Sequence, residues 1–344
     1  MSELPASDRS MSDRSMSDIP AITLADVESA AALLDGVAVR TPLLEFEALN
    51  ARVGGRVLLK CEGFQHTGSF KFRGAYNRLA RLAPAERAAG VVAFSSGNHA
   101  QGVADAARRL GMRATIVMPA DAPAIKLANT RALGAEVVTY DRLRESREAI
   151  AARIAAERGS VLVPAFDDPY VMAGQGTIGL EIAAQAAERG VAVDQAVACC
   201  AGGGLSSGIA VALAGRSPAT RLYATEPAGH DDLARSLQSG RREVNEPGTR
   251  SICDALLVVQ PGELTFPILR ARLSGVLVVT DPEVRDAMRL AFRDLKLVVE
   301  PGGAAALAAV LAGRLETRGR VTAVTLSGAN VDPEAFARVL TSTG

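Results

Sequence analysis

Short β-rich hydrophobic runs alternate along this chain with longer, alanine-rich stretches that carry one polar face. The hydrophobic runs predict buried parallel strands at residues 56–62, 90–96, 113–119, 135–140, 195–200, 221–226 and 321–328. The strands are separated by segments with the hydrophobic period of an α-helix, at residues 99–110, 122–133, 145–158, 174–189 and 282–296. This alternation predicts an open α/β sheet, in which ligands bind beyond the carboxyl ends of the strands.

The N-terminal residues do not share this pattern. The segment SDRSM occurs at 7–11 and again at 12–16, and such a polar repeat buries too little apolar surface to offset its ordering entropy. We therefore expect residues 1–18 to form a disordered tail. Folded sequence is predicted to begin near Ile22, where Thr23 caps an amphipathic helix with acidic residues in its first turn.

Composition narrows the class of protein. The chain has 344 residues, 48% hydrophobic and 22% charged, which predicts a substantial core divided between two lobes. The 38 Lys and Arg residues balance the 38 Asp and Glu residues, so no basic field indicates a nucleic-acid partner. Without a membrane-length apolar run or a signal peptide, we expect a cytoplasmic protein and no membrane partner. The 4 cysteines include no Cys-x-x-Cys pair, which excludes a disulfide framework or zinc cluster.

Glycine and small polar residues follow several predicted strands. The segments SSGNHAQG (95–102) and AGGGLSSG (201–208) place hydroxyl and backbone N–H groups at the start of a helix, which suits an anion. A third strand ends in SGAN (327–330), and EPGGAAAL marks a helix start at Glu300. After a fourth strand, the segment HTGSFKFRGAYN contains Lys71. Lysine is normally a surface residue, and its place in an otherwise packed segment needs an explanation. The neighbouring turns, which suit an anion, supply one.

The turn at 202–208 also permits a different interpretation. It follows a strand, opens a helix and is followed about twenty residues later by Glu226, the place of the ribose-binding acid in a dinucleotide-binding fold. However, its glycine spacing departs from G-x-G-x-x-G, and a Rossmann-type NAD-binding oxidoreductase leaves Lys71 without a role. We keep that class as a distant alternative.

Five blocks, KCEGFQHTGSFKFRGA, SSGNHAQGVA, AGQGTIGLEI, AGGGLSSGIA and LSGANVD, resemble in order and spacing the pyridoxal-phosphate-dependent threonine and serine dehydratases and serine racemases. The resemblance extends from about residue 22 to the end of the chain. It implies the tryptophan synthase β-like fold type II, with two open, mostly parallel twisted sheets, helices on both faces and the cofactor between two domains. We expect a large cofactor-binding domain of residues 19–89 and 169–344 and a small substrate-closing domain of residues 90–168.

The resemblance also implies how the cofactor is held. Lys71 would form the Schiff base and act as the catalytic base, which suits a lysine whose pKa is lowered by desolvation. Asn98 would contact the phenolic oxygen and Ser327 the pyridine nitrogen, where a hydroxyl makes the ring a moderate electron sink. The phosphate would be bound by the backbone N–H groups of Ala201, Gly202, Gly203, Gly204 and Leu205. Ala201 and Ala329 stand where the family often has glycine, but alanine keeps the backbone donor.

Other implied residues face the substrate. Ser95, Gly97 and His99 would help to hold its carboxylate, and Ser96 matches the serine that protonates the opposite face of the substrate in serine racemases. Arg147 matches an arginine that could pair with a second carboxylate, although an exposed helix arginine is the alternative.

The segment EPAGHDD matches a divalent-cation site of the same group of enzymes. The ligands for Mg²⁺, Mn²⁺ or Ca²⁺ would be the carboxylates of Glu226 and Asp232 and the carbonyl of His230. Two ordinary surface acids after a strand are the alternative interpretation.

Together these assignments predict an ammonia-lyase that converts L-threonine, L-serine or 3-hydroxyaspartate to a 2-keto acid and ammonia by β-elimination. A serine or aspartate racemase with side dehydratase activity is the main alternative, because it depends on Ser96. A protein that binds pyridoxal phosphate without turnover would be expected to lack Lys71 or Asn98, and both are present. We expect a homodimer or homotetramer.

Overall fold

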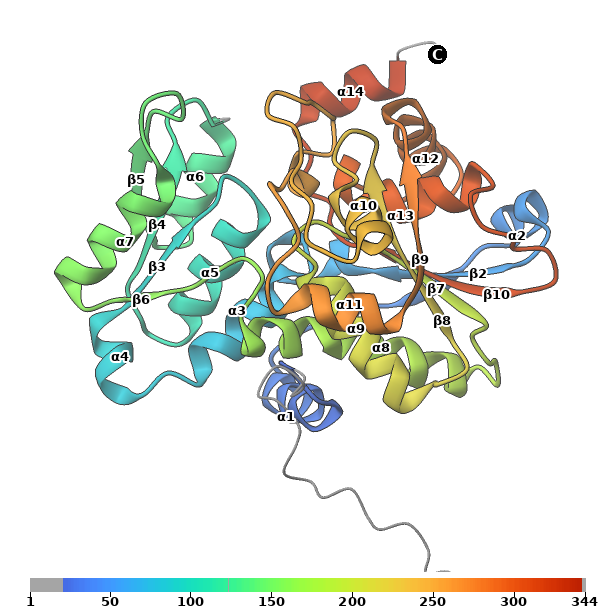
Figure 1. The fold of residues 1–344 in the computed structure, drawn as a ribbon, viewed down its shortest axis with the longest axis horizontal. Helices are drawn as coiled ribbons and strands as arrows, with labels where there is room; N and C mark the ends of the chain where they lie inside the picture. The colour runs from blue at the N-terminus through green and yellow to red at the C-terminus, as the bar shows by residue number, and fades with distance from the viewer. Residues whose placement is uncertain (1–20, 123, 342–344) are drawn as a thin grey trace, which may run out of the picture.

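The computed structural model describes residues 21–122 and 124–341. The predicted tail at 1–18 lies outside these residues. The chain forms two lobes, each built on its own sheet (Figure 1). No helix in the described part of the chain is both long and apolar enough to cross a bilayer.

The larger lobe contains a six-stranded sheet with the order β1-β2-β10-β7-β8-β9. Only β1 runs antiparallel, against β2, and every other neighbour is parallel. The parallel strands read as nearly continuous apolar runs because the sheet is buried on both faces. Their bounds are β1 Leu43–Glu45, β2 Arg56–Cys61, β7 Gln195–Cys199, β8 Arg221–Pro227, β9 Leu273–Val279 and β10 Val321–Leu326.

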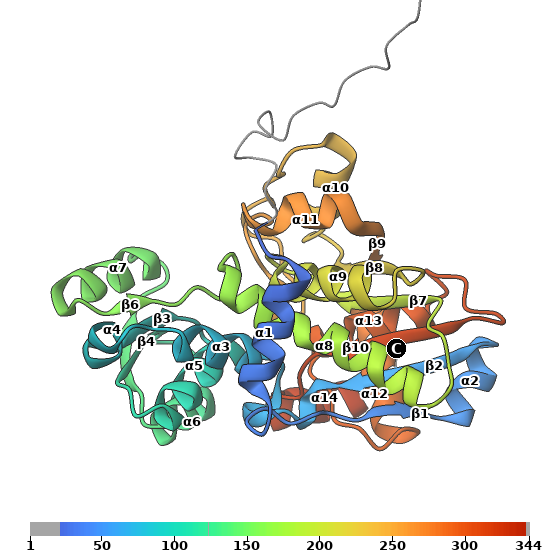
Figure 2. The same cartoon turned by 90° about the horizontal axis from the view of Figure 1, so that it is seen from below.

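Helices cover both faces of this sheet. One group of helices packs around α8 and α9. It comprises α1 Leu24–Leu34, α8 Pro169–Glu188, α9 Gly204–Arg216 and α11 Thr265–Arg272. Figure 2 shows α1 beside α8. A second group packs around α13, which lies against β7 to β10, and it comprises α12 Asp281–Arg293, α13 Pro301–Leu311 and α14 Pro333–Thr341. The predicted cap of α1 is confirmed: Thr23 Oγ1 accepts a hydrogen bond from Asp26 N, and the Asp26 carboxylate accepts one from Thr23 N.

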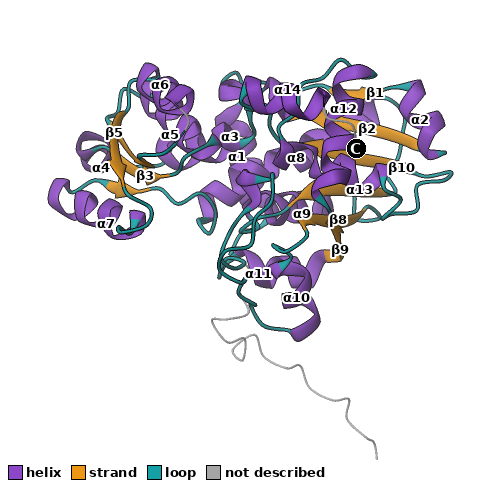
Figure 3. Cartoon of the chain, turned by 90° about the horizontal axis from the view of Figure 1, so that it is seen from above, coloured by secondary structure: helices purple, strands orange, loops and turns teal. Residues whose placement is uncertain are grey.

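The smaller lobe contains a parallel four-stranded sheet with the order β5-β4-β3-β6, and Figure 3 shows it in orange at the left, with β5 and β3 labelled. Successive residues of β3 enter different hydrophobic clusters, Val91 and Ala93 in one and Val92 in the other, because strand side chains alternate between faces. The bounds are β3 Val91–Phe94, β4 Ala114–Pro119, β5 Glu136–Tyr140 and β6 Val161–Leu162, with helices α5 Asn98–Arg109, α6 Ala124–Ala132 and α7 Arg147–Arg158.

Helix α3 (Lys71–Ala80) lies between the two lobes. Its Phe72 and Leu79 enter the hydrophobic cluster of the smaller sheet, while its other side contacts α8 of the larger lobe. That contact is backbone to backbone: a Cβ on Gly174 would lie 2.6 Å from the Cα of Gly74. The domain boundary at residue 90 stays a prediction. The remaining elements are α2 Glu47–Val53, α4 Pro84–Ala89, α10 Asp232–Ser239 and the 3₁₀ turns η2 Glu62–Phe64, η3 His66–Gly68 and η4 Asp254–Leu256.

The strands predicted from the sequence are confirmed to within a few residues, but β1, β6 and β9 were not anticipated. Helix α8 begins at Pro169 rather than at residue 174. Asp168 caps it by accepting hydrogen bonds from two backbone N–H groups, and proline is favourable in the first turn.

Candidate active site

Lys71 is positioned by pairing between two loops that are distant in sequence. Phe70 N donates to Ser327 O at 3.1 Å, and Ala329 N donates to Gly68 O at 2.9 Å. These bonds join the loop after β2 to the loop after β10, the neighbouring strand. Lys71, the first residue of α3, therefore lies near Ser327, as the cofactor prediction requires.

The amine of Lys71 loses its proton more readily than an ordinary lysine. Its Nζ donates to the carbonyl oxygen of Ala165 at 2.7 Å. Burial lowers its pKa to about 8, and a smaller influence of Cys199 opposes this shift. A substantial fraction of neutral amine is therefore present near physiological pH, which is the form that attacks an aldehyde.

The polar residues after β3 lie at the start of α5. Ser95 Oγ accepts a hydrogen bond from Gly97 N at 3.2 Å, and Ser95, Ser96 and Gly97 are all partly exposed. The buried His99 contacts the Val163 carbonyl oxygen through Nε2 at 2.9 Å. Burial and the nearby Lys71 lower the His99 pKa to about 3, so its ring is neutral.

Asn98 lies in a chain of polar contacts that includes a residue without a predicted role. Its Nδ2 donates to Glu300 Oε1 at 2.6 Å, and its Oδ1 accepts from Asn330 Nδ2 at 2.8 Å. Burial raises the pKa of Glu300 to about 7. The sequence marked Glu300 only as a helix start, because nothing local indicates its contact with a residue two hundred positions earlier.

The glycine-rich loop after β7 forms the N-terminal end of α9. Gly203 has φ of 94°, a conformation that favours glycine. A Cβ on Gly202 would lie 2.3 Å from the ring of Phe166, so only glycine fits there. Thr265 Oγ1 braces the loop by donating to Gly202 O at 2.6 Å. Backbone N–H groups at the start of this 13-residue helix suit a phosphate, so residues 201–205 fit the predicted role.

Ser327 and Cys199 form a buried pair at the carboxyl ends of β10 and β7. The Cys199 thiol donates to Ser327 Oγ at 3.2 Å. Burial raises the thiol pKa to about 11, so Cys199 keeps its proton. The Ser327 hydroxyl hydrogen is then available for another acceptor, which fits a contact with a pyridine nitrogen.

Arg147 lies at the start of α7, apart from the contacts above. Its guanidinium carbon lies 5.3 Å from the ring centroid of Phe94, the residue before Ser95. It also pairs with Glu148 at 2.8 Å, and its side chain is 47% exposed. The structure thus places Arg147 beside the end of β3 but does not connect it to the other site residues.

The predicted cation ligands lie after β8. Glu226 accepts hydrogen bonds from the backbone N–H groups of Leu233 and Ala234, and Asp232 Oδ1 accepts from Asn245 Nδ2 at 2.5 Å. Asp232 Oδ2 is buried without a hydrogen-bond partner. Burial raises the Asp232 pKa to about 6. Burial and the nearby Asp232 carboxylate raise the Glu226 pKa well above its ordinary value. Two buried carboxylates with an unused oxygen fit a divalent cation.

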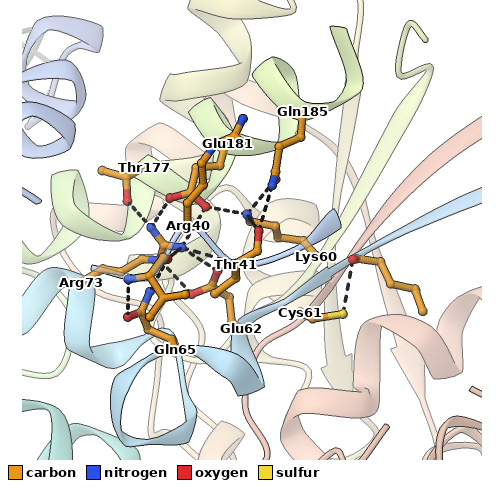
Figure 4. A network of polar contacts seen from close by, with 12 residues as sticks. Arg40, Thr41, Lys60, Cys61, Glu62, Gln65, Arg73, Thr177, Glu181 and Gln185 are labelled. Atoms are coloured by element: carbon orange, nitrogen blue, oxygen red, sulfur yellow. Dashed lines mark hydrogen bonds and ion pairs between the residues drawn. The ribbon is translucent and has the colours of Figure 1, made fainter. Parts of the chain in front are cut away.

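A buried ionic network supports α3 two residues beyond Lys71 (Figure 4). The Arg73 guanidinium makes a two-point contact with Glu62, at 2.8 and 2.9 Å, and also reaches Glu181 at 2.6 Å. Lys60 donates to Glu181 at 2.5 Å and to Gln185 at 2.9 Å. Two cations and two anions balance, so the network ties α3 to β2 and α8 without a net buried charge.

A lysine amine of lowered pKa at the same end of the sheet as a glycine-rich turn that suits a phosphate provides what covalent binding of pyridoxal phosphate requires, so fold and site together define a pyridoxal-phosphate enzyme of fold type II. The family model described as pyridoxal-phosphate dependent enzyme matches residues 34–328. The chain belongs to this family.

Relatives refine this assignment. L-threo-3-hydroxyaspartate ammonia-lyase from Pseudomonas sp. is 46% identical over 92% of this chain and 97% of its own length. Serine racemase from Schizosaccharomyces pombe is 37% identical over 92% and 97%. The crystal structure of a threonine deaminase from T.th. superposes with a TM-score of 0.85 at 45% identity, covering 90% of this chain and 99% of that one. The predicted enzyme class, a pyridoxal-phosphate lyase related to serine racemases, is confirmed.

Proposed function

We propose that this protein is an ammonia-lyase for β-hydroxy amino acids, with 3-hydroxyaspartate as its preferred substrate over L-threonine and L-serine. The observation that carries the reaction type is the Lys71 amine, whose pKa of about 8 suits a proton acceptor. Support for 3-hydroxyaspartate comes from Arg147 beside the end of β3 and from the similarity to the Pseudomonas enzyme.

Pyridoxal phosphate, when bound, supplies an electron sink for breaking the Cα–H bond. Lys71 Nζ holds the cofactor and takes the α-proton. Residues 201–205 hold the phosphate, while Asn98 and Ser327 contact the ring, and Ser95, Gly97 and His99 hold the substrate carboxylate. The β-hydroxyl leaves as water and hydrolysis restores one water, so the 2-keto acid and ammonia together contain the atoms of the substrate.

We also propose a divalent cation, Mg²⁺, Mn²⁺ or Ca²⁺, bound by the carboxylates of Glu226 and Asp232 and the carbonyl oxygen of His230. Its charge would neutralise two buried acids and its binding would stabilise the segment after β8. Its role is therefore structural support of the lobe rather than a step of the reaction.

The remaining expectations extend this proposal. A cytoplasmic location is supported by four buried cysteines that form no disulfide in the described part of the chain. The balanced charge of 38 basic and 38 acidic residues supports a small amino acid, rather than nucleic acid, as partner. We propose a homodimer or homotetramer, which analytical ultracentrifugation can distinguish.

The test is release of 2-keto acid from the stereoisomers of 3-hydroxyaspartate, threonine and serine. We expect the highest kcat/KM for one isomer of 3-hydroxyaspartate and no product from Lys71→Ala. Lys296→Arg, at an exposed lysine, serves as the control and should behave as wild type. Keto acid production by Lys71→Ala, or none by the wild type with any of these compounds, would contradict the proposal.

A serine racemase activity is the second candidate. Ser96 is partly exposed in the same turn as Asn98, and serine racemases are among the relatives. A serine hydroxyl has a high pKa and needs assistance to act as a base, so we expect elimination to exceed racemisation. Faster interconversion of serine enantiomers than pyruvate formation would make racemisation the primary activity.

A further inference from the structure

Glu300 is a buried acid that the reaction described above does not use. Its residue is 4% exposed, and it is the N-cap residue of α13. Its backbone N–H donates to Gly328 O at 3.1 Å. A Cβ on Gly328 would lie 2.3 Å from Glu300 Oε1, so the carboxyl group occupies the space that this glycine leaves open. The carboxyl group is thereby fixed against the loop that also carries Ser327.

Glu300 and Asn330 together determine which way the Asn98 amide faces. Asn330 Nδ2 donates to Asn98 Oδ1 at 2.8 Å and to Thr67 O at 2.7 Å. On the other side of the amide, Asn98 Nδ2 donates to Glu300 Oε1 at 2.6 Å. With one end accepting and the other donating, a flipped amide would lose both bonds. The second N–H of Asn98 has no acceptor among the described residues and is free for the cofactor.

The titratable groups around Glu300 come from three other elements. Asp254 of η4 raises its pKa, and Lys126 of α6, paired with Asp254 at 3.0 Å, lowers it. Cys199 of β7 is a neutral thiol. Burial has the largest effect and brings the Glu300 pKa to about 7. A negative oxygen beside Asn98 would raise this pKa further, because like charges disfavour the ionised carboxylate.

We propose that Glu300 is a positioning residue for the cofactor: its carboxyl group orients the Asn98 amide toward the phenolic oxygen and takes up a proton when that oxygen is negative. The proton comes from solvent and bonds to a Glu300 carboxyl oxygen. This inference rests on the proposed function only through the role of Asn98 in cofactor binding.

Two substitutions separate orientation from proton uptake. Glu300→Gln keeps an acceptor for Asn98 Nδ2 but cannot titrate, whereas Glu300→Ala removes the acceptor. Loss of one hydrogen bond in a buried site is expected to speed cofactor release from Glu300→Ala about tenfold relative to Glu300→Gln. Glu246→Gln, at an exposed glutamate, is the matched control.

Proton uptake by Glu300 predicts a definite direction for the pH dependence of cofactor retention. If the cofactor raises the Glu300 pKa, retention by the wild type is strongest below about pH 7 and weakens as pH rises above it, by up to about tenfold per unit. The Glu300→Gln protein lacks this dependence. The release rate of the wild type divided by that of Glu300→Gln isolates the ionisation of Glu300 from those of the cofactor and Lys71. This ratio should be several-fold higher at pH 8.5 than at pH 6.5.

The experiment follows loss of the cofactor's visible absorbance from each holoenzyme during dialysis at pH 6.5, 7.5 and 8.5, with thermal melting to verify the fold. Equal release from Glu300→Ala and Glu300→Gln overturns the orienting role. A constant ratio of wild type to Glu300→Gln overturns the proton uptake. Because no turnover is measured, failure of keto acid production with the expected release pattern contradicts only the proposed function, and a wild type that binds no cofactor overturns both.

Discussion

The buried ionic network that ties α3 to β2 and α8 predicts a large loss of stability for a single isosteric change, Glu62→Gln. Glu62 is fully buried, and it contributes one of two negative charges that balance Arg73 and Lys60. The amide keeps the size of the side chain but leaves two buried cations to share Glu181. Breaking a buried ion pair from one side costs about 3–5 kcal/mol, because the remaining charge is uncompensated.

Thermal melting measures this cost. The chain has 344 residues, so the melting temperature falls by about 1.4 °C per kcal/mol, and that of Glu62→Gln should fall by about 4–7 °C. Glu45→Gln is the matched control, since Glu45 pairs with Arg56 near the surface, where an ion pair contributes about 0–1 kcal/mol. Equal melting temperatures for the two variants would refute the argument from buried charge.

The deficit should also depend on pH in a defined direction. Burial lowers the pKa of Lys60 in the folded protein, and Glu62 partly opposes this shift. Without Glu62, the folded-state pKa of Lys60 falls further below that of the unfolded chain. The unfolded state then binds more protons, so the stability of the variant increases with pH relative to wild type. A melting difference that widens from pH 7 to pH 9 would contradict this assignment of Lys60.

Three other predictions concern the site. The kcat, which reports groups of the substrate-bound enzyme, should rise with pH between 6.5 and 9, because Lys71 released from the cofactor accepts a proton only as the neutral amine, and a flat kcat profile over this range would exclude it as the base. A strong chelator should lower the melting temperature and Mg²⁺ should restore it, through ion binding at Glu226 and Asp232; an unchanged melting temperature would mean that no cation binds there. Ser96→Ala should abolish racemisation of L-serine and preserve most dehydration of L-substrates. Residual racemisation would show that Ser96 is not the residue that exchanges a proton with the opposite face of the substrate.

Local signals in the sequence predicted the alternating elements, and with the family resemblance they supplied the candidate site residues. The β-rich runs identified the central strands because these are buried on both faces and read as continuous apolar segments. Strand β9 was missed because it follows α11 directly, with no turn residues between them to mark its start. The edge strand β1 is only 3 residues long, too short for a periodic signal.

Residues that act through distant contacts could not be predicted in this way. Glu300 is an ordinary acid at a helix start until Asn98 and Gly328 are placed beside it. Lys60 and Glu62 lie within a predicted strand, and no local signal indicates their partners Arg73 and Glu181, which come from α3 and α8. The packing of α3 against both lobes likewise has no local signal, since it depends on which elements the fold brings to its two sides.

The pairing of the Lys71 loop with residues 327–330 has a consequence for synthesis of the protein. Ser69 and Gly328 form a β-bridge, so the reactive lysine lies against a segment that the ribosome makes about 260 residues later. A nascent chain that has released only its first half carries Lys71 without Ser327, Glu300 or the glycine loop. The proposed cofactor site is therefore complete only after nearly the whole chain has emerged, and a product terminated before Ser327 lacks part of it.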